Sequence, residues 1–158
     1  MKKYIWLIIM LVSTFCACAG EKNDKAGNTA INGDSQMKIS IKIDNGTEVN
    51  TLTATLVDNS SAKAFYTLLQ KGSVTVNMHD YGSFEKVGPL PQSLPRNDTQ
   101  ITTTAGDIIL YQGNQITIYY DRNSWTFTRL GKVDNVTQAE LKSILGSGNA
   151  TAVFTVKE

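Results

Sequence analysis

The chain of 158 residues has only two cysteines, Cys16 and Cys18, and both lie near its N-terminus. The long segment that follows has no cysteine for an internal disulfide, a zinc–thiolate site, a thiolate nucleophile or a redox pair. An apolar core must therefore stabilise any domain that this segment forms. A domain of this size buries about two-thirds of its unfolded surface, so it can fold without covalent staples.

Histidine and net charge are equally scarce. The only histidine is His79, and the formal net charge at pH 7 is +1. One histidine with scattered carboxylates does not supply three or four metal ligands, and no serine lies in a nucleophile-elbow sequence. The near-neutral charge gives no basic stripe for nucleic acid and no cationic helix for a membrane surface. The sequence therefore predicts no metal, no cofactor and no nucleic-acid partner, and His79 is interpreted as a partly exposed residue at a strand end.

The first residues have the pattern of an export signal. Lys2 and Lys3 precede the short apolar run YIWLIIMLVSTF, and small residues and then a polar segment follow. Ala17 immediately before Cys18 predicts a bacterial lipoprotein, with residues 1–17 as its signal peptide and Cys18 as its lipidation site. Two alternatives remain. The first is a permanent membrane helix, although such a helix needs about twenty apolar residues, more than this run has. The second is a soluble secreted protein, which cleavage after Ala19 would release.

The next segment, EKNDKAGNTAINGDSQ, is rich in asparagine, glycine, aspartate and lysine. It has too few large apolar residues to offset the entropy lost on ordering. We interpret residues 18–36 as a flexible tether between a lipid anchor and one domain over residues 37–158. This arrangement predicts a cell-envelope protein that is anchored in the membrane through its N-terminal lipid and faces the periplasm or the cell surface.

Residues 37–158 have mostly strand-like patterns. Polar and apolar residues alternate in MKISIKID, and Asp44-Asn45-Gly46 predicts a tight hairpin turn after it. Further strands are predicted from β-branched and aromatic content. Their sequences are EVNTLTATLV, VTVNM, ITTTAGDIILYQ, NQITIYY, SWTFTRLGKV and ATAVFTVK. The loop GPLPQSLPRND holds all three prolines and is too proline-rich for a central strand.

Two segments have helical spacing instead. Apolar residues recur at helical intervals within 59–71, where Ser60 or Ser61 can cap the start and Gly72 the end. Residues 137–145 form the second predicted helix, and Thr137 with Glu140 has the spacing of a capping box. Seven or eight strands with two short helices predict a mainly β domain, either a closed barrel or a sandwich.

Three motifs resemble a largely uncharacterised bacterial family of proteins with a cyclophilin-like fold. They are Phe84-Glu85-Lys86 before the proline loop, Gly106-Asp107-Ile108, and Trp125 through Arg129-Leu130-Gly131, and the likeness extends over residues 37–158. The resemblance implies a closed cyclophilin-like β-barrel with two short helices. Some members look like tails on flavodoxin-like domains; this chain has no such domain, so no flavin is implied.

The sequence departs from true prolyl isomerases at two places. Those enzymes carry an arginine in a Phe-His-Arg context and a Gln-Gly-Gly-Asp run. Here His79 is followed by Asp80, and Gly106-Asp107 has no Gln-Gly before it. Because a fold does not fix a function, isomerase activity is not implied. Gly106 is better explained by a backbone bend, and Asp107 by hydrogen bonds from loop amides.

Aromatic residues are the best candidates for a binding site. Alternate residues of a strand face opposite sides, so Tyr119 and Tyr120 point apart, whereas Trp125 shares a face with Phe127 and Arg129. Most of the rings are expected in the core, and the others can line a groove near the proline loop. The predicted groove comprises Tyr81, Phe84, Glu85, Arg96, Tyr111, Tyr119, Trp125 and Arg129.

The sequence thus favours a non-enzymatic module that binds a peptide or a small molecule. The alternative is a weak prolyl isomerase, in which Arg96 or Arg129 would donate to the amide whose rotation barrier is about 20 kcal/mol. A third interpretation is a structural component of an envelope complex.

Overall fold

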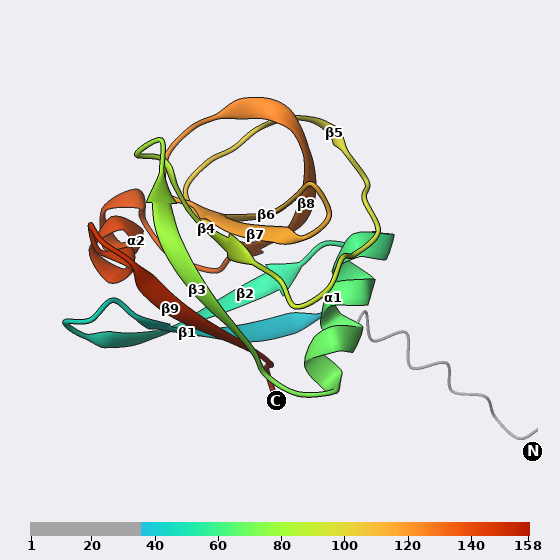
Figure 1. The fold of residues 1–158 in the computed structure, drawn as a ribbon, viewed down its shortest axis with the longest axis horizontal. Coiled ribbons are helices and arrows are strands. Elements are labelled where there is room, and N and C mark those ends of the chain that lie inside the picture. The colour runs from blue at the N-terminus through green and yellow to red at the C-terminus, as the bar shows by residue number, and fades with distance from the viewer. Residues whose placement is uncertain (1–35) are drawn as a thin grey trace, which may run out of the picture. The chain divides into compact units, whose positions relative to one another are not determined.

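A single antiparallel sheet closes on itself in the computed structural model, which describes residues 36–158 (Figure 1). The predicted signal peptide, Cys18 and all but the last residue of the predicted tether lie outside the described residues. The strands are β1 (Lys38–Asp44), β2 (Val49–Leu56), β3 (Val74–Tyr81), β4 (Glu85–Pro89), β5 (Thr99–Thr102), β6 (Asp107–Tyr111), β7 (Gln115–Tyr119), β8 (Ser124–Val133) and β9 (Ala150–Val156). The helices are α1 (Ser60–Gln70) and α2 (Gln138–Leu145).

The neighbours run in the order β2-β1-β9-β3-β4-β7-β6-β8, and β8 pairs back with β2. The closing seam is short, with Leu56 opposite Gly131 and Ala54 opposite Val133. The predicted closed barrel is therefore confirmed, and the sandwich alternative is wrong.

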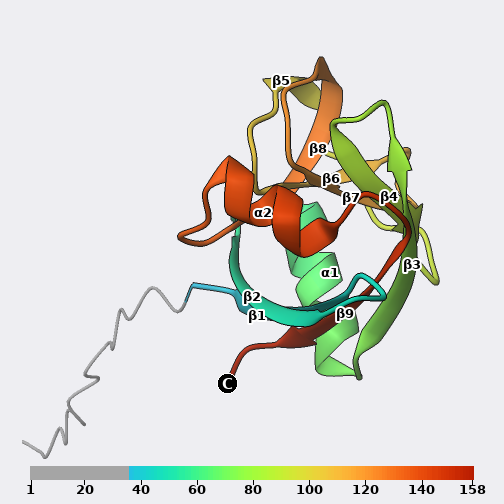
Figure 2. The same ribbon diagram turned by 90° about the vertical axis from the view of Figure 1, so that its left-hand side faces the viewer.

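The two halves of the long strand β8 pair with different strands. Its C-terminal half pairs with β6 and β2 in the barrel wall, and its N-terminal half, from Ser124 to Phe127, pairs only with β5. Both views show β5 and the start of β8 at the end of the molecule away from the C-terminus (Figures 1 and 2). This two-stranded arm stands beside the outer face of the barrel.

The barrel interior is filled by alternate strand residues and by the helices. Ile39, Ile41 and Ile43 of β1 are fully buried, as the alternation in MKISIKID predicts. The helices lie on opposite sides of the barrel (Figures 1 and 2). Phe65 of α1 packs edge-on against Phe154, with ring centroids 5.7 Å apart, and Leu141 of α2 joins the same core cluster.

Local signals in the sequence placed most turns and caps correctly. The Asp44 carboxylate accepts from the Gly46 amide at 2.9 Å in the predicted hairpin turn. Thr137 and Glu140 form the predicted capping box of α2. Asp107 accepts from the Thr104 amide at 2.8 Å, as expected for a carboxylate at a loop.

Three expectations about the elements were wrong. Asn59 caps α1 by accepting from the Ala62 amide at 2.8 Å, whereas Ser61 is buried and donates to the Pro95 carbonyl. The segment 101–112 is not one strand, because the chain turns between β5 and β6. Strand β4 includes the first residues of the proline loop, and Pro89 is tolerated because it is the last residue of that strand.

Candidate functional site

A pocket of about 290 Å³ opens on the outer face of the barrel, between the β3–β4 turn and the arm. We call it the aromatic pocket. It is lined by Tyr81, Phe84, Glu85, Tyr111, Tyr119, Asn123, Trp125 and Phe127. Its size falls at the lower end of the range for small-molecule sites.

Strand alternation explains why the aromatic pocket is outside the barrel. Ile118 belongs to the interior core, whereas its neighbour Tyr119 packs with Ile109 and Phe127 in a separate, smaller cluster. Glu85 pairs with Tyr119 across the sheet, and cross-strand partners project from the same face. The β4, β7, β6 and β8 part of the wall thus has apolar side chains on both faces, and the outer set forms the pocket.

The rings form a continuous series. Phe84 stacks on Tyr119 with centroids 5.9 Å apart and planes 4° from parallel. Tyr81 meets Phe84 edge-on at 6.0 Å, and Phe127 contacts Tyr119 at 5.7 Å and Tyr111 at 6.4 Å. These separations are typical of favourable aromatic pairs. Tyr81 and Trp125 remain 60% and 62% exposed, so they stand at the rim.

Glu85 is the one carboxylate that lines the aromatic pocket, and only 7% of its surface is exposed. Its Oε2 atom has no hydrogen-bond partner among the described residues. Burial raises the pKa of Glu85, and a contact with the Tyr119 hydroxyl offsets part of that effect. Burial, with the adjacent Glu85, also raises the pKa of Tyr119. The pocket therefore has apolar walls and a polar group that is poorly satisfied.

The turn between β3 and β4 holds Phe84 in place. Gly82 has φ +60, and a Cβ atom there would lie 2.1 Å from the Phe84 ring, so any other residue would be strained and would displace that ring. The Phe84 carbonyl accepts from the amides of Tyr120 and Asp121 at 2.9 and 3.1 Å. These bonds fix the turn to the end of β7, beside the pocket.

The structure brings together six of the eight residues of the predicted groove and separates the two arginines from them. Arg96 pairs with Asp98, and Arg129 contacts Asp107 at 3.2 Å. Neither arginine lines the aromatic pocket. Arg96 faces Asp98, its near neighbour in sequence, whereas Arg129 faces Asp107, which is distant in sequence and close only in the fold.

Asn123 lines the pocket and was missed, because an asparagine in a polar loop has no distinguishing signal in the sequence. Tyr120 points to the other side of the sheet, as alternation predicts. Its hydroxyl donates to Asp80 at 2.9 Å, and burial together with that carboxylate raises the pKa of Tyr120 to about 12.

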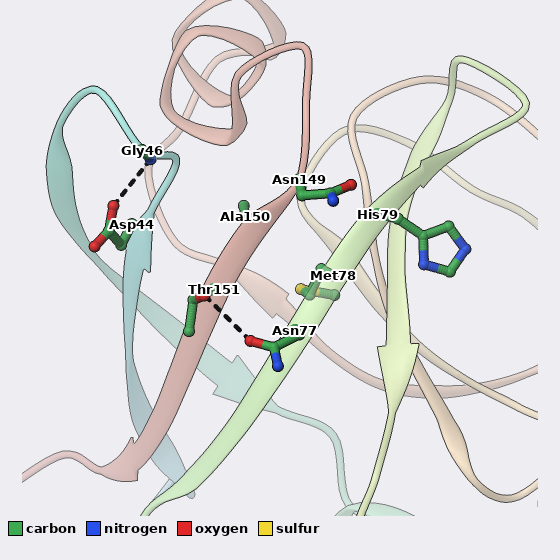
Figure 3. A pocket seen from close by; sticks show the side chains of 8 residues that line it. All are labelled: Asp44, Gly46, Asn77, Met78, His79, Asn149, Ala150 and Thr151. Carbon is green, nitrogen blue, oxygen red and sulfur yellow. Dashed lines mark hydrogen bonds between the residues drawn. The ribbon is translucent and has the colours of Figure 1, made fainter.

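A second, larger hollow of about 570 Å³ lies along β3 and β9 (Figure 3). Two pairs of its polar groups bond each other: the Thr151 hydroxyl donates to Asn77 at 3.2 Å, and the Gly46 amide donates to Asp44 at 2.9 Å. The exposed His79 side chain points away from Thr151 and Asp44 (Figure 3), so no nucleophile and base converge there. The smaller aromatic pocket is the better candidate, because it combines apolar area with a buried polar group.

Within residues 36–158, no group of three or more histidine, cysteine, aspartate or glutamate side chains is placed to hold a metal ion. In the same part of the chain, neither helix has the length and apolar character required to cross a bilayer.

Comparison with known families agrees with the fold. The model of the cyclophilin-like family matches residues 41–156, which run from within β1 to the end of β9. No curated protein matches the chain. The family match includes all three motifs on which the resemblance was based, and so confirms it.

Proposed function

We propose that this chain, which belongs to the cyclophilin-like family, is a non-enzymatic binding module that receives a peptide side chain or a small molecule in the aromatic pocket. The observation that supports this most is the pocket itself, with the exposed rings of Tyr81, Tyr111 and Trp125 and a buried carboxyl inside. Large aromatic side chains left in water are a recurrent sign of a binding surface.

The pocket suits binding better than catalysis. An isomerase needs a donor beside an apolar proline site to weaken amide conjugation. Arg96 and Arg129, the donors considered from the sequence, are paired with Asp98 and Asp107 and do not line the pocket. No lysine, arginine or histidine is among the described residues that line it.

Binding is tested with the twenty N-acetyl amino-acid amides as probes and backbone amide shifts as the readout. We expect at least one probe to shift amides around Tyr81, Glu85 and Trp125, and Tyr81→Ala or Trp125→Ala to weaken it by about tenfold. Val49→Ala is the matched control, because Val49 is an exposed apolar residue outside the pocket. If no probe shifts these amides, the proposal fails.

The same protein is assayed for isomerisation of a proline peptide. We expect no acceleration. Acceleration that is abolished by Arg96→Ala or Arg129→Ala would establish the enzymatic alternative instead.

We further propose that a lipid on Cys18 holds the domain at the cell envelope. The support is the charged, apolar and small-residue order of residues 1–19. Cys18→Ser should abolish labelling by a fatty-acid analogue and release the protein from the membrane fraction, whereas Cys16→Ser should do neither. Labelling that survives Cys18→Ser would contradict the anchor.

A further inference from the structure

Glu85 differs from the other carboxylates that the structure buries or half-buries. Asp107 has Arg129 and Lys132 beside it, and even the exposed Asp80 has Lys86 at 3.0 Å. Asp98 and Asp134 are likewise paired with a cation, Arg96 and Lys38 respectively. Within the described part of the chain, Glu85 has no such partner, although only 7% of its surface is exposed.

A buried carboxylate without a counter-ion is unfavourable, because it loses water and gains no opposite charge. A pocket that contains one is therefore suited to a ligand that brings the positive charge. The raised pKa of Glu85 is consistent with this, since burial without a cation disfavours the ionised form.

The walls of the aromatic pocket favour a particular kind of cation. Six rings line it: Tyr81, Phe84, Tyr111, Tyr119, Trp125 and Phe127. The faces of aromatic rings attract organic cations, and the attraction strengthens where water is excluded. A metal ion would need several oxygen or nitrogen ligands, whereas an alkylammonium group needs only rings around it and one carboxylate.

We propose that the aromatic pocket is a cation cage, in which the rings surround an ammonium or alkylated ammonium group and Glu85 is its counter-ion. This rests on the proposed binding function and specifies the ligand's chemical class. The Asn123 side chain at the pocket wall offers an amide to a polar substituent of the ligand. The cation can come from a free amine or from a lysine side chain of a peptide.

The test uses the fluorescence of Trp125. The full chain with Trp6→Phe has Trp125 as its sole tryptophan, because the sequence contains only two. It is titrated with choline and with the uncharged analogue in which carbon replaces the quaternary nitrogen. In a second arm, N-acetyl-lysine amide is compared with N-acetyl-norleucine amide. The two arms distinguish a free amine from a peptide side chain.

We expect at least one cation to bind about tenfold or more tightly than its neutral analogue. Glu85→Gln should remove that preference, whereas Glu48→Gln, which changes an exposed turn residue, should leave it intact. Thermal unfolding of each variant shows whether the fold is retained.

Three results would overturn the cation cage. Equal binding of a cation and its neutral analogue would leave the pocket as a binding site but remove the role of charge. A cation preference that survives Glu85→Gln in a folded protein would place the charge recognition elsewhere. The absence of binding in both arms would also overturn the inference, and the amino-acid amide panel then decides separately whether the pocket binds at all.

Discussion

At the scale of the residue, Glu85 and Lys86 show that a shift of one position in a strand decides whether a buried charge has a partner of opposite sign. They are neighbours in β4 and project from opposite faces of the sheet. Lys86 is fully buried, yet it is satisfied by Asp80 and by the Gly148 carbonyl. Glu85 is buried among rings with no cation beside it. The sequence placed both residues in a motif but could not show that only one would be compensated.

The pH dependence of stability tests this contrast. Because the folded pKa of Glu85 is raised, the folded chain keeps a proton that the unfolded chain releases, and stability falls as pH rises through that window. Glu85→Gln should therefore raise the unfolding midpoint at pH 7 and have little effect below about pH 4, where the unfolded carboxyl is also protonated.

Glu140→Gln should behave in the opposite way. Hydrogen bonds from Thr137 lower the pKa of Glu140, so its contribution is present at neutral pH and is lost as pH falls. Thermal unfolding of both variants across pH is the measurement. If Glu85→Gln lowers the unfolding midpoint at pH 7, Glu85 is not an uncompensated charge that destabilises the fold.

Two glycine variants distinguish the effect of backbone strain on stability from the effect of pocket shape on binding. Gly82→Ala and Gly46→Ala both place alanine at positive φ, at a cost of about 1–2 kcal/mol each. Only the Cβ at residue 82 collides with Phe84, because nothing lies within 4 Å of the one at residue 46. Gly82→Ala should therefore also weaken choline binding, as measured by titration, and Gly46→Ala should not. Equal effects on binding would argue against Phe84 as a wall of the site.

At the scale of the element, the sequence predicted the strands that alternate or are rich in β-branched and aromatic residues, those of β6 and β7 included, and it missed β4. The alternation in β1 is clear, and its bounds were close to those observed. Four residues of β4, Glu85 to Gly88, are all buried, so this strand has no alternation to detect. The N-cap of α1 was also predicted at the wrong residue. Asn59 and the two serines are all good caps by type, and in the fold the Ser61 hydroxyl donates to the Pro95 carbonyl instead of capping the helix.

The two roles of Asn59 can be tested together. Its side chain caps α1 and also donates to the Arg129 carbonyl at 2.8 Å, which links the helix to β8. Asn59→Ala should lower the free energy of unfolding by about 1–2 kcal/mol. Ser60→Ala is the matched control, because Ser60 is exposed and does not cap the helix. Urea unfolding that gives equal losses for the two variants would contradict this assignment.

At the scale of the whole molecule, two apolar layers share one curved sheet. The interior layer, with Phe65 and Phe154, carries the stability that a cysteine-free domain requires. The outer layer around Tyr119 is small and remains open to solvent. Strand patterns predicted the strands and the alternation of their faces. The arm of β5 and β8, which forms one side of the pocket, depends on contacts between residues distant in sequence.

The two layers should respond separately to mutation. Phe65→Ala removes a fully buried ring and should lower the free energy of unfolding by about 3–5 kcal/mol. At a temperature where the variant is folded, its affinity for choline should match that of the parent, because Phe65 lies in the interior cluster and not in the pocket. Phe65→Leu gives a milder version of the same test in urea unfolding. A loss of affinity in folded Phe65→Leu would show that the layers are coupled.

The aromatic pocket is proposed to bind a cationic group between its rings, and NMR cross-relaxation tests this most directly. With the cation that binds in the fluorescence titrations as the probe, the account predicts nuclear Overhauser effects from the protons nearest its nitrogen to the rings of Phe84, Tyr119 and Phe127. Effects confined to residues of the hollow near His79, or none to these three rings at a saturating concentration of that cation, would contradict it.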